Sequence, residues 1–412
     1  MMAGLRTTYI PELLEMHFEE LQFLWGRRQS ILRSPVVSMR QCLALEERIE
    51  GHVQGLLVAR DRVIPLLEEG LTADESAATF AASYPLLRLG TEQARTLVMD
   101  AFTSAEGARR RGLAQALCHA PMDKSLRAAA QAAFFSAAPS LSAAAAEVLA
   151  FHRLVPPELR PIEQLLGDEN PSVRRSGWRV VAILGLPVGP KLYAAAMRDD
   201  EVDIRTAAVH AAAWSALPAA LAIGRDVSRE TAAQYMGALE LLGILGTPED
   251  LPRITDIGKA QDLGPVRFHI LACFGHPGLV DLLLAELASP DPATACAAGA
   301  AFTKMTGADI DSKTRTKLPP EDGHEPDEFE TEFLEEVRLP DPEIARNHWG
   351  KLKPRLARAT RICRGFDISQ GVTAEALASL DMESRWEFFL RSKFTGKWTG
   401  SPADLERFPQ PR

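Results

Sequence analysis

The sequence predicts an all-α fold, an α-solenoid of about eight helical hairpins. Three observations lead to this prediction. Hydrophobic residues make up 46% of the 412-residue chain and aromatic residues only 7%, and alanine-rich, helix-forming stretches recur along it. Glycines that end helical runs are periodic, since Gly90 and Gly307 lie seven intervals of 31 residues apart. Prolines that can stop one helix and begin the next recur every 29 to 31 residues, at Pro156, Pro187, Pro218, Pro248 and Pro277.

The N-terminal residues 1–71 are predicted to form a helical cap on the array. Tyr9–Leu32 carries a stripe of apolar side chains at helical spacing, and Ser38–Gln41 is a capping-box pattern that opens a second helix through about Arg60. Terminal repeats need an element that covers the exposed end of the core, and we expect this pair of helices to do so. A separate dimerising hairpin is the alternative that the sequence leaves open.

Residues 72–308 are predicted to form the repeat array. Within one period, a first helix such as Lys191–Arg198 is followed by a short acidic turn, Asp199–Glu201, and by a second helix, Ile204–Ala216. The acidic residues stabilise the positive N-terminal end of the second helix. The small side chains of that helix allow the neighbouring hairpin to approach closely.

The charge pattern changes abruptly after the array. Asp309–Ala345 contains 13 acidic and 4 basic residues and five prolines, so we expect residues 309–341 to be an acidic, proline-rich linker. We expect the part over Ser312–Glu328 to be flexible. Arg346–Arg412 has a net charge of +6 and enough aromatic residues for a small core. Residues 342–412 are therefore predicted to form an appended helical module.

Three segments resemble HEAT repeats of the short, bacterial, PBS-lyase-like kind: Asp168–Arg174, Ile204–Ala208 and Leu242–Asp250. In that family an Asp and an Arg of successive repeats form a stacked ladder. The resemblance implies such a ladder here, with Asp168 and Arg174, and Asp200 and Arg205, as the clearest matches. The repeat that ends at Gly275 departs from the pattern, because its Val-Arg pair lies about three residues closer to the terminal glycine.

The layout of the whole chain is similar to that of a bacterial family of HEAT-repeat proteins often encoded beside type VI secretion components. The similarity includes the C-terminal segments Asp341–Trp349, Ala357–Ile368 and Ser384–Phe394. It implies an accessory or adaptor role near secreted effectors, and it implies no known chemistry.

Composition excludes several classes of function. A formal net charge of -9 argues against a protein whose main task is binding nucleic acid. No apolar run approaches the roughly 18 residues that a membrane span requires, and the first residues do not resemble a signal peptide, so we expect no membrane contact and a cytoplasmic location. The five cysteines lie far apart, without a CxxC pair, which indicates neither a disulfide framework nor a zinc ribbon.

Nothing in the sequence has the pattern of a catalytic, cofactor or metal site. P-loop, G-x-G-x-x-G, G-x-S-x-G and H-E-x-x-H motifs are all absent. The best metal-like group is His269, Cys273 and His276, because positions four apart share a helix face. Aligning the repeats on their terminal glycines places Cys273 at a core position and His276 in a turn, which favours a structural role. His119 and His210 have no nucleophile beside them in a catalytic sequence context, so we expect no enzyme.

Arginines are the candidate partner-binding residues. Lys351 and Lys353 precede four arginines at three-residue spacing, which would cover half the surface of a helix: Arg355, Arg358, Arg361 and Arg364. A solvated face, pairing with the acidic linker and docking of an anionic partner remain open for this group. Arg175 and Arg179 are expected at exposed positions of a second helix, where a partner bound to the repeat surface would contact them.

The predicted function is that of a non-enzymatic scaffold or adaptor that binds a protein on its repeat surface, in the service of type VI secretion or its effectors. One alternative is an immunity protein that neutralises a toxin, for which an acidic surface suits a basic partner. A second alternative is a HEAT-like lyase or a nucleic-acid repair enzyme. The net charge of -6 over residues 1–308 disfavours the repair enzyme.

Overall fold

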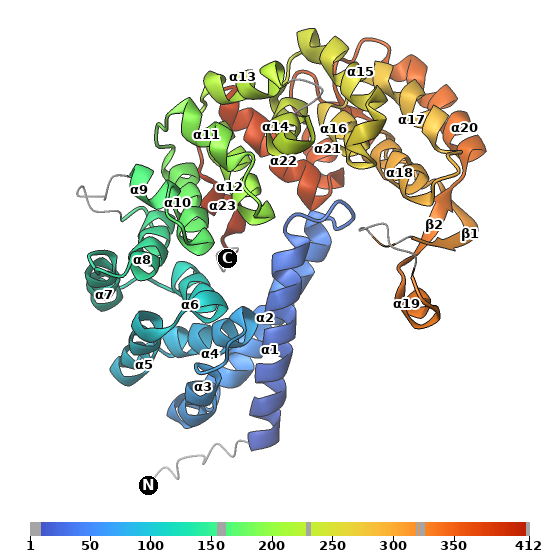
Figure 1. The fold of residues 1–412 in the computed structure, drawn as a ribbon. Coiled ribbons are helices and arrows are strands. Elements are labelled where there is room, and N and C mark those ends of the chain that lie inside the picture. Colours follow the sequence, from blue (N-terminus) through green and yellow to red (C-terminus); the bar gives the residue numbers. More distant parts are fainter. Residues whose placement is uncertain (1–9, 155–161, 228–231, 319, 321–325, 409–412) are drawn as a thin grey trace. The chain divides into compact units, whose positions relative to one another are not determined.

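The computed structural model describes residues 10–154, 162–227, 232–318, 320 and 326–408 (Figure 1). Regular structure in these ranges is helical apart from two small two-stranded sheets, so the predicted all-α class is confirmed. Contacts group the chain into two units. The first consists of Met1–Ser215 with Thr399–Arg412, and the second of Ala216–Trp398. The predicted boundaries of the cap, array, linker and module stay predictions.

The N-terminal helices α1 (Pro11–Ile31) and α2 (Met39–Leu57) form an antiparallel pair close to the predicted ranges. The predicted capping box is present. Ser38 Oγ accepts a hydrogen bond from the backbone N–H of Gln41 at 3.4 Å, and Gln41 Oε1 accepts one from the backbone N–H of Ser38 at 2.8 Å. One side of α2 is buried through Leu45, Ile49, Val53 and Leu56, and α1 packs against α4 of the first hairpin.

Five helical hairpins follow in the first unit. Their second helices α4, α6, α8, α10 and α12 pack against one another in chain order, as the small side chains on them allow. After the short η1 (Arg60–Val63), the helices are α3 (Ile64–Gly70), α4 (Ser76–Leu89), α5 (Glu92–Ser104), α6 (Gly107–His119), α7 (Lys124–Phe134), α8 (Pro139–Phe151), α9 (Ile162–Leu166), α10 (Pro171–Leu184), α11 (Pro190–Ala196) and α12 (Val202–Trp214).

Three further hairpins open the second unit, so the described part of the chain has eight, as predicted. The first hairpin begins at α3, ahead of the expected start near Thr72. Again the second helices α14, α16 and α18 are the ones that stack. The elements are α13 (Pro218–Asp226), η2 (Ala232–Tyr235), α14 (Met236–Leu245), η3 (Pro248–Asp250), α15 (Leu251–Lys259), η4 (Gln261–Leu263), α16 (Val266–Phe274), η5 (Pro277–Leu279), α17 (Val280–Glu286) and α18 (Pro292–Thr306).

The periodic glycines end the second helices, as expected. Gly90, Gly185, Gly275 and Gly307 adopt the left-handed conformation that a residue with a side chain rarely adopts. Gly246 ends α14 with a φ of -54°, so a left-handed backbone does not explain the glycine at this position, and the lack of space for a side chain does. A Cβ at that position would clash with the backbone oxygen of Leu242 and would lie 3.1 Å from the Phe274 ring. Of the periodic prolines, Pro156 lies outside the described residues.

Arg174 connects two successive repeats. Its guanidinium donates to both carboxylate oxygens of Asp199 in the next repeat, at 2.9 and 3.1 Å, and to the backbone oxygen of Asp168 in its own repeat. Arg205 donates to the backbone oxygens of Asp199 and Asp200. The carboxylate that accepts the hydrogen bonds of Arg174 is thus that of Asp199, one residue before the Asp200 of the predicted ladder. The family resemblance itself stays a prediction.

The expected flexible linker is wrong for Ser312–Lys317. These residues belong to strand β1 (Asp311–Lys317), which pairs antiparallel with β2 (Glu336–Pro340), and α19 (Glu328–Phe333) lies between the two strands in sequence. Thr and basic residues alternate along β1, and Arg315 pairs with Glu336 across the strands at 2.7 Å. Residues 319 and 321–325 of the predicted linker lie outside the described residues.

The C-terminal segment contributes to both units. Up to Trp398 it belongs to the second unit, with α20 (Pro342–Leu352), η6 (Lys353–Leu356), the two-residue strands β3 (Ile362–Cys363) and β4 (Phe366–Asp367), α21 (Ala374–Ser379) and α22 (Met382–Phe394). The last helix, α23 (Pro402–Glu406), packs against α10 of the first unit.

Candidate functional site

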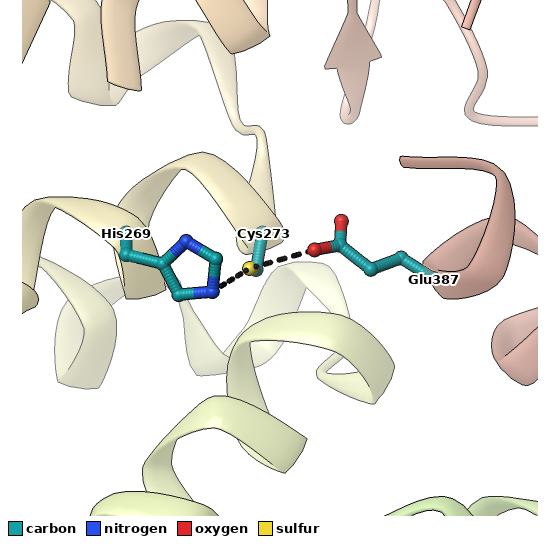
Figure 2. A group of neighbouring side chains, drawn as sticks. All are labelled: His269, Cys273 and Glu387. Carbon is teal, nitrogen blue, oxygen red and sulfur yellow. Dashed lines mark hydrogen bonds between the residues drawn. The ribbon is translucent and has the colours of Figure 1, made fainter. Parts of the chain in front are cut away.

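Two places in the described chain gather chemically functional side chains. One is a buried cluster in the second unit. Figure 2 shows His269 and Cys273, one turn apart on α16, facing Glu387 of α22. Cys273 Sγ lies 3.4 Å from His269 Nε2 and donates to Glu387 Oε1 at 3.1 Å. The predicted proximity of His269 and Cys273 is confirmed, whereas His276 accepts a hydrogen bond from the Gly278 amide in the turn before α17.

Lys304 of α18 supplies the positive charge of this cluster. Its ammonium donates to Glu387 Oε1 at 2.5 Å, to Glu383 Oε2 at 2.7 Å and to Cys273 Sγ at 3.5 Å. Burial alone would lower the pKa of Lys304, but Cys273, Glu387 and Glu383 hold it well above its ordinary value. The same ammonium outweighs burial at Glu387 and lowers the pKa of that carboxyl. Lys304 and Glu387 therefore form a charged pair.

The ligand atoms of His269, Cys273 and Glu387 lie within 4.8 Å of one another, and nitrogen, sulfur and oxygen are donors that zinc accepts. Burial, however, raises the pKa of the Cys273 thiol well above its ordinary value, and Lys304 already neutralises the carboxylate. A metal ion would have to deprotonate the thiol and displace the ammonium. The geometry favours an ionic network that joins α16, α18 and α22. The predicted absence of a metal site stays a prediction.

The same burial argues against Cys273 as a nucleophile. Only 2% of the residue is exposed, and a raised thiol pKa is the opposite of the shift that activates a catalytic cysteine. Burial and the raised thiol pKa therefore favour a packing role for Cys273.

Two of the arginines predicted to bind a partner hold the second unit together. Arg361 is 8% exposed and donates to four backbone oxygens at the ends of α14 and α16, those of Gly243, Ile244, Gly246 and Cys273. Helix ends leave such carbonyls unpaired, so a buried guanidinium there acts as a shared C-terminal cap. Arg364 pairs with Asp381 at 2.7 Å.

Arg355 and Arg358 are exposed. The four arginines do not share a helix, because the chain leaves η6 at Leu356 and enters β3 at Ile362. The expectation of a helical arginine surface is therefore wrong.

The second place is a groove in the first unit, which residues Ser401–Phe408 occupy. Two pockets of about 360 and 660 Å³ lie along it, and Cys118, His119 and Phe151 line both. Glu406 lines the smaller pocket and Phe408 the larger. The segment Ser401–Phe408 thus lines both pockets. We call this feature the C-terminal groove.

Arginines surround the Glu406 carboxylate in the smaller pocket. Arg179 donates to both of its oxygens, at 3.1 and 2.6 Å, and Arg33 lies 3.6 Å away. Burial alone would raise the pKa of Glu406, but Arg179 lowers it to about 2. Arg179 also donates to Glu147, a buried acid of α8, at 2.5 Å. Arg28, Arg33, Arg111, Arg175 and Arg179 outnumber the acids Glu147, Asp203 and Glu406 among the lining residues.

Phe408 is the second anchor of the segment. Its ring lies 4.8 Å from His119, 5.8 Å from Trp25 and 5.6 Å from Tyr84, measured between ring centroids. The Arg28 guanidinium lies 4.6 Å from the same ring and donates to the backbone oxygen of Glu406 at 2.7 Å.

Further contacts hold the segment along its length. Asp404 pairs with Arg153 at 2.9 Å, and Arg407 donates to the backbone oxygen of Phe151.

Arg175 and Arg179 were expected to be exposed, and this is wrong. Both are half-buried in the smaller pocket, where Arg175 lies 3.9 Å from Glu147. Burial lowers the pKa values of His119 and His210, which also line this pocket.

Sequence reasoning missed Arg28, Glu147 and Glu406. A lone acid within the apolar stretch Leu141–Phe151 was the available signal for Glu147. No sequence pattern predicted that Glu406 is buried and ion-paired, because its partner Arg179 lies 227 residues away.

The comparisons with known proteins leave the family open. No family model matches the chain, and no curated protein is significantly similar to it in sequence. Among solved structures, that of YibA from Escherichia coli superposes with a TM-score of 0.39 at 18% identity, covering 62% of this chain and 96% of that one. None of the described helices is both long enough and apolar enough to span a membrane.

Proposed function

We propose that the protein is a cytoplasmic, non-enzymatic scaffold or adaptor that binds a protein partner in the C-terminal groove. One observation carries the proposal: a peptide segment, Ser401–Phe408, already occupies this groove through a carboxylate and an aromatic ring. Stacked helical repeats form the extended surfaces on which such folds bind their partners. The resemblance to proteins encoded beside type VI secretion components would place the partner among those components.

Charge distribution also supports a binding role. Arginines concentrated in one pocket of an acidic chain favour an acidic segment over a nucleic acid, whose phosphates require a basic surface of greater extent.

A photo-crosslinking amino acid at Gln29 tests this proposal. Gln29 is exposed and lines the smaller pocket. The matched control is the same probe at Ser125, an exposed position on the first helix α7. In the native cells, we expect Gln29 to give a discrete protein adduct that Ser125 does not give. Identical adducts from both positions, or none from Gln29, would refute binding in this groove.

A further inference from the structure

The segment Ser401–Phe408 has the character of a bound ligand although it belongs to the same chain. It reaches the groove through the connector Thr395–Gly400, which begins with three exposed residues. Two separate pockets remain beside it. A short tethered segment of this kind competes with free ligands through its high effective concentration.

The contacts define what the groove recognises. Arg179 fixes a carboxylate in a bidentate geometry, which specifies both charge and direction. Two positions later, an aromatic ring is enclosed by Trp25, Tyr84 and His119. Between these anchors, Arg28 binds a backbone oxygen, a contact that any sequence could make.

We infer that the C-terminal groove recognises protein segments with an acidic residue followed two positions later by an aromatic residue, and that Ser401–Phe408 is an internal occupant that such a segment displaces. This inference rests on the proposed function and adds the chemistry of the partner. The tether keeps the groove closed to weak ligands, because a competitor binds only to the fraction of molecules whose segment has left.

A full-length protein with a protease site inserted between Gly396 and Lys397 tests the inference after the chain has folded. The probe is a fluorescent peptide with the sequence of Ser401–Phe408. We expect this peptide to bind at least tenfold more tightly once the connector is cut and the released segment removed. The control peptide carries Glu406→Gln and Phe408→Ala and should bind at least tenfold more weakly than the native peptide.

Three results would overturn the inference: equal affinity before and after cutting, equal affinity for the two peptides, or a cut segment that stays bound through gel filtration and dilution. Hydrogen exchange of peptides from α4 to α12 in the cut protein shows whether the first unit remains folded. The crosslinking experiment at Gln29 separates this inference from the proposed function. An adduct at Gln29 together with failure of the peptide would leave a binding scaffold with a different ligand chemistry.

Discussion

Replacement of Lys304 by Met tests the buried network of the second unit. The substitution keeps an apolar chain of similar length but removes the ammonium that lies 2.5 Å from Glu387 and 2.7 Å from Glu383. Removing one member of a buried ion pair costs about 3–5 kcal/mol, since a charge is left without a partner. Glu387 can relieve this by taking up a proton, which at pH 7 costs about 3.5 kcal/mol for a carboxyl of ordinary pKa. We therefore expect Lys304→Met to lower the free energy of unfolding by about 3 kcal/mol.

The loss should depend on pH. Protonation of Glu387 becomes easier as the pH falls, so the difference from the native protein should shrink to about 1 kcal/mol at pH 5. Urea unfolding followed by circular dichroism gives the free energy, and hydrogen exchange of α22 peptides assigns the loss to the second unit.

The matched control is Lys353→Met. Lys353 pairs with Asp281 at 3.3 Å where both side chains are more than half exposed, so its loss should cost under about 1 kcal/mol. Equal effects of the two substitutions would refute the buried network, as would a Lys304→Met loss that does not change between pH 7 and pH 5.

Three further predictions follow from the same contacts. Arg361→Met should destabilise the second unit by about 2–4 kcal/mol in urea unfolding, because four backbone oxygens lose a buried charged donor, whereas the exposed Arg355→Met should have little effect. The pKa of Glu406 is lowered from 4.5 to about 2, so its contribution to stability is complete above pH 4.5 and is lost as the pH falls toward 2. The protection factor of the α23 amides, which is the intrinsic exchange rate divided by the measured rate at the same pH, should fall over that range and should stay nearly constant in Glu406→Gln. Cys273 should react with iodoacetamide at least tenfold more slowly than Cys296, which is more exposed, and equal rates would show that the cluster opens to solvent.

Local patterns predicted the helices well because their causes are local. The capping box at Ser38, the left-handed glycines and the prolines that begin α13, η3 and η5 each act within a few residues, so their positions follow from the sequence. Pro187 is the exception, because it lies between α10 and α11 and begins neither helix. The strand β1 was missed because the net charge of the acidic segment concealed the alternation of Thr and basic residues along Lys313–Lys317.

The candidate site could be predicted only in part, because it depends on contacts between distant residues. Cys273 and Glu387 are 114 residues apart, and Arg179 and Glu406 are 227 apart. The four-residue spacing predicted that His269 and Cys273 lie close together on one helix. The sequence did not predict that Lys304 of α18 and Glu387 of α22 contact Cys273. The same limit applies to Arg361. The sequence indicated a charge on a helix surface, whereas in the structure the buried Arg361 guanidinium donates to backbone oxygens of distant helices in the second unit.

Competition for the groove is the most direct test of a scaffold with an internal occupant. The Gln29 adduct with the native partner is measured in the presence of saturating Ser401–Phe408 peptide, or of the peptide carrying Glu406→Gln and Phe408→Ala. We predict that the native peptide reduces the adduct at least tenfold and that the altered peptide leaves it unchanged. An adduct that persists at full yield under saturating native peptide would contradict the account, because the partner and the C-terminal segment would then not share a site.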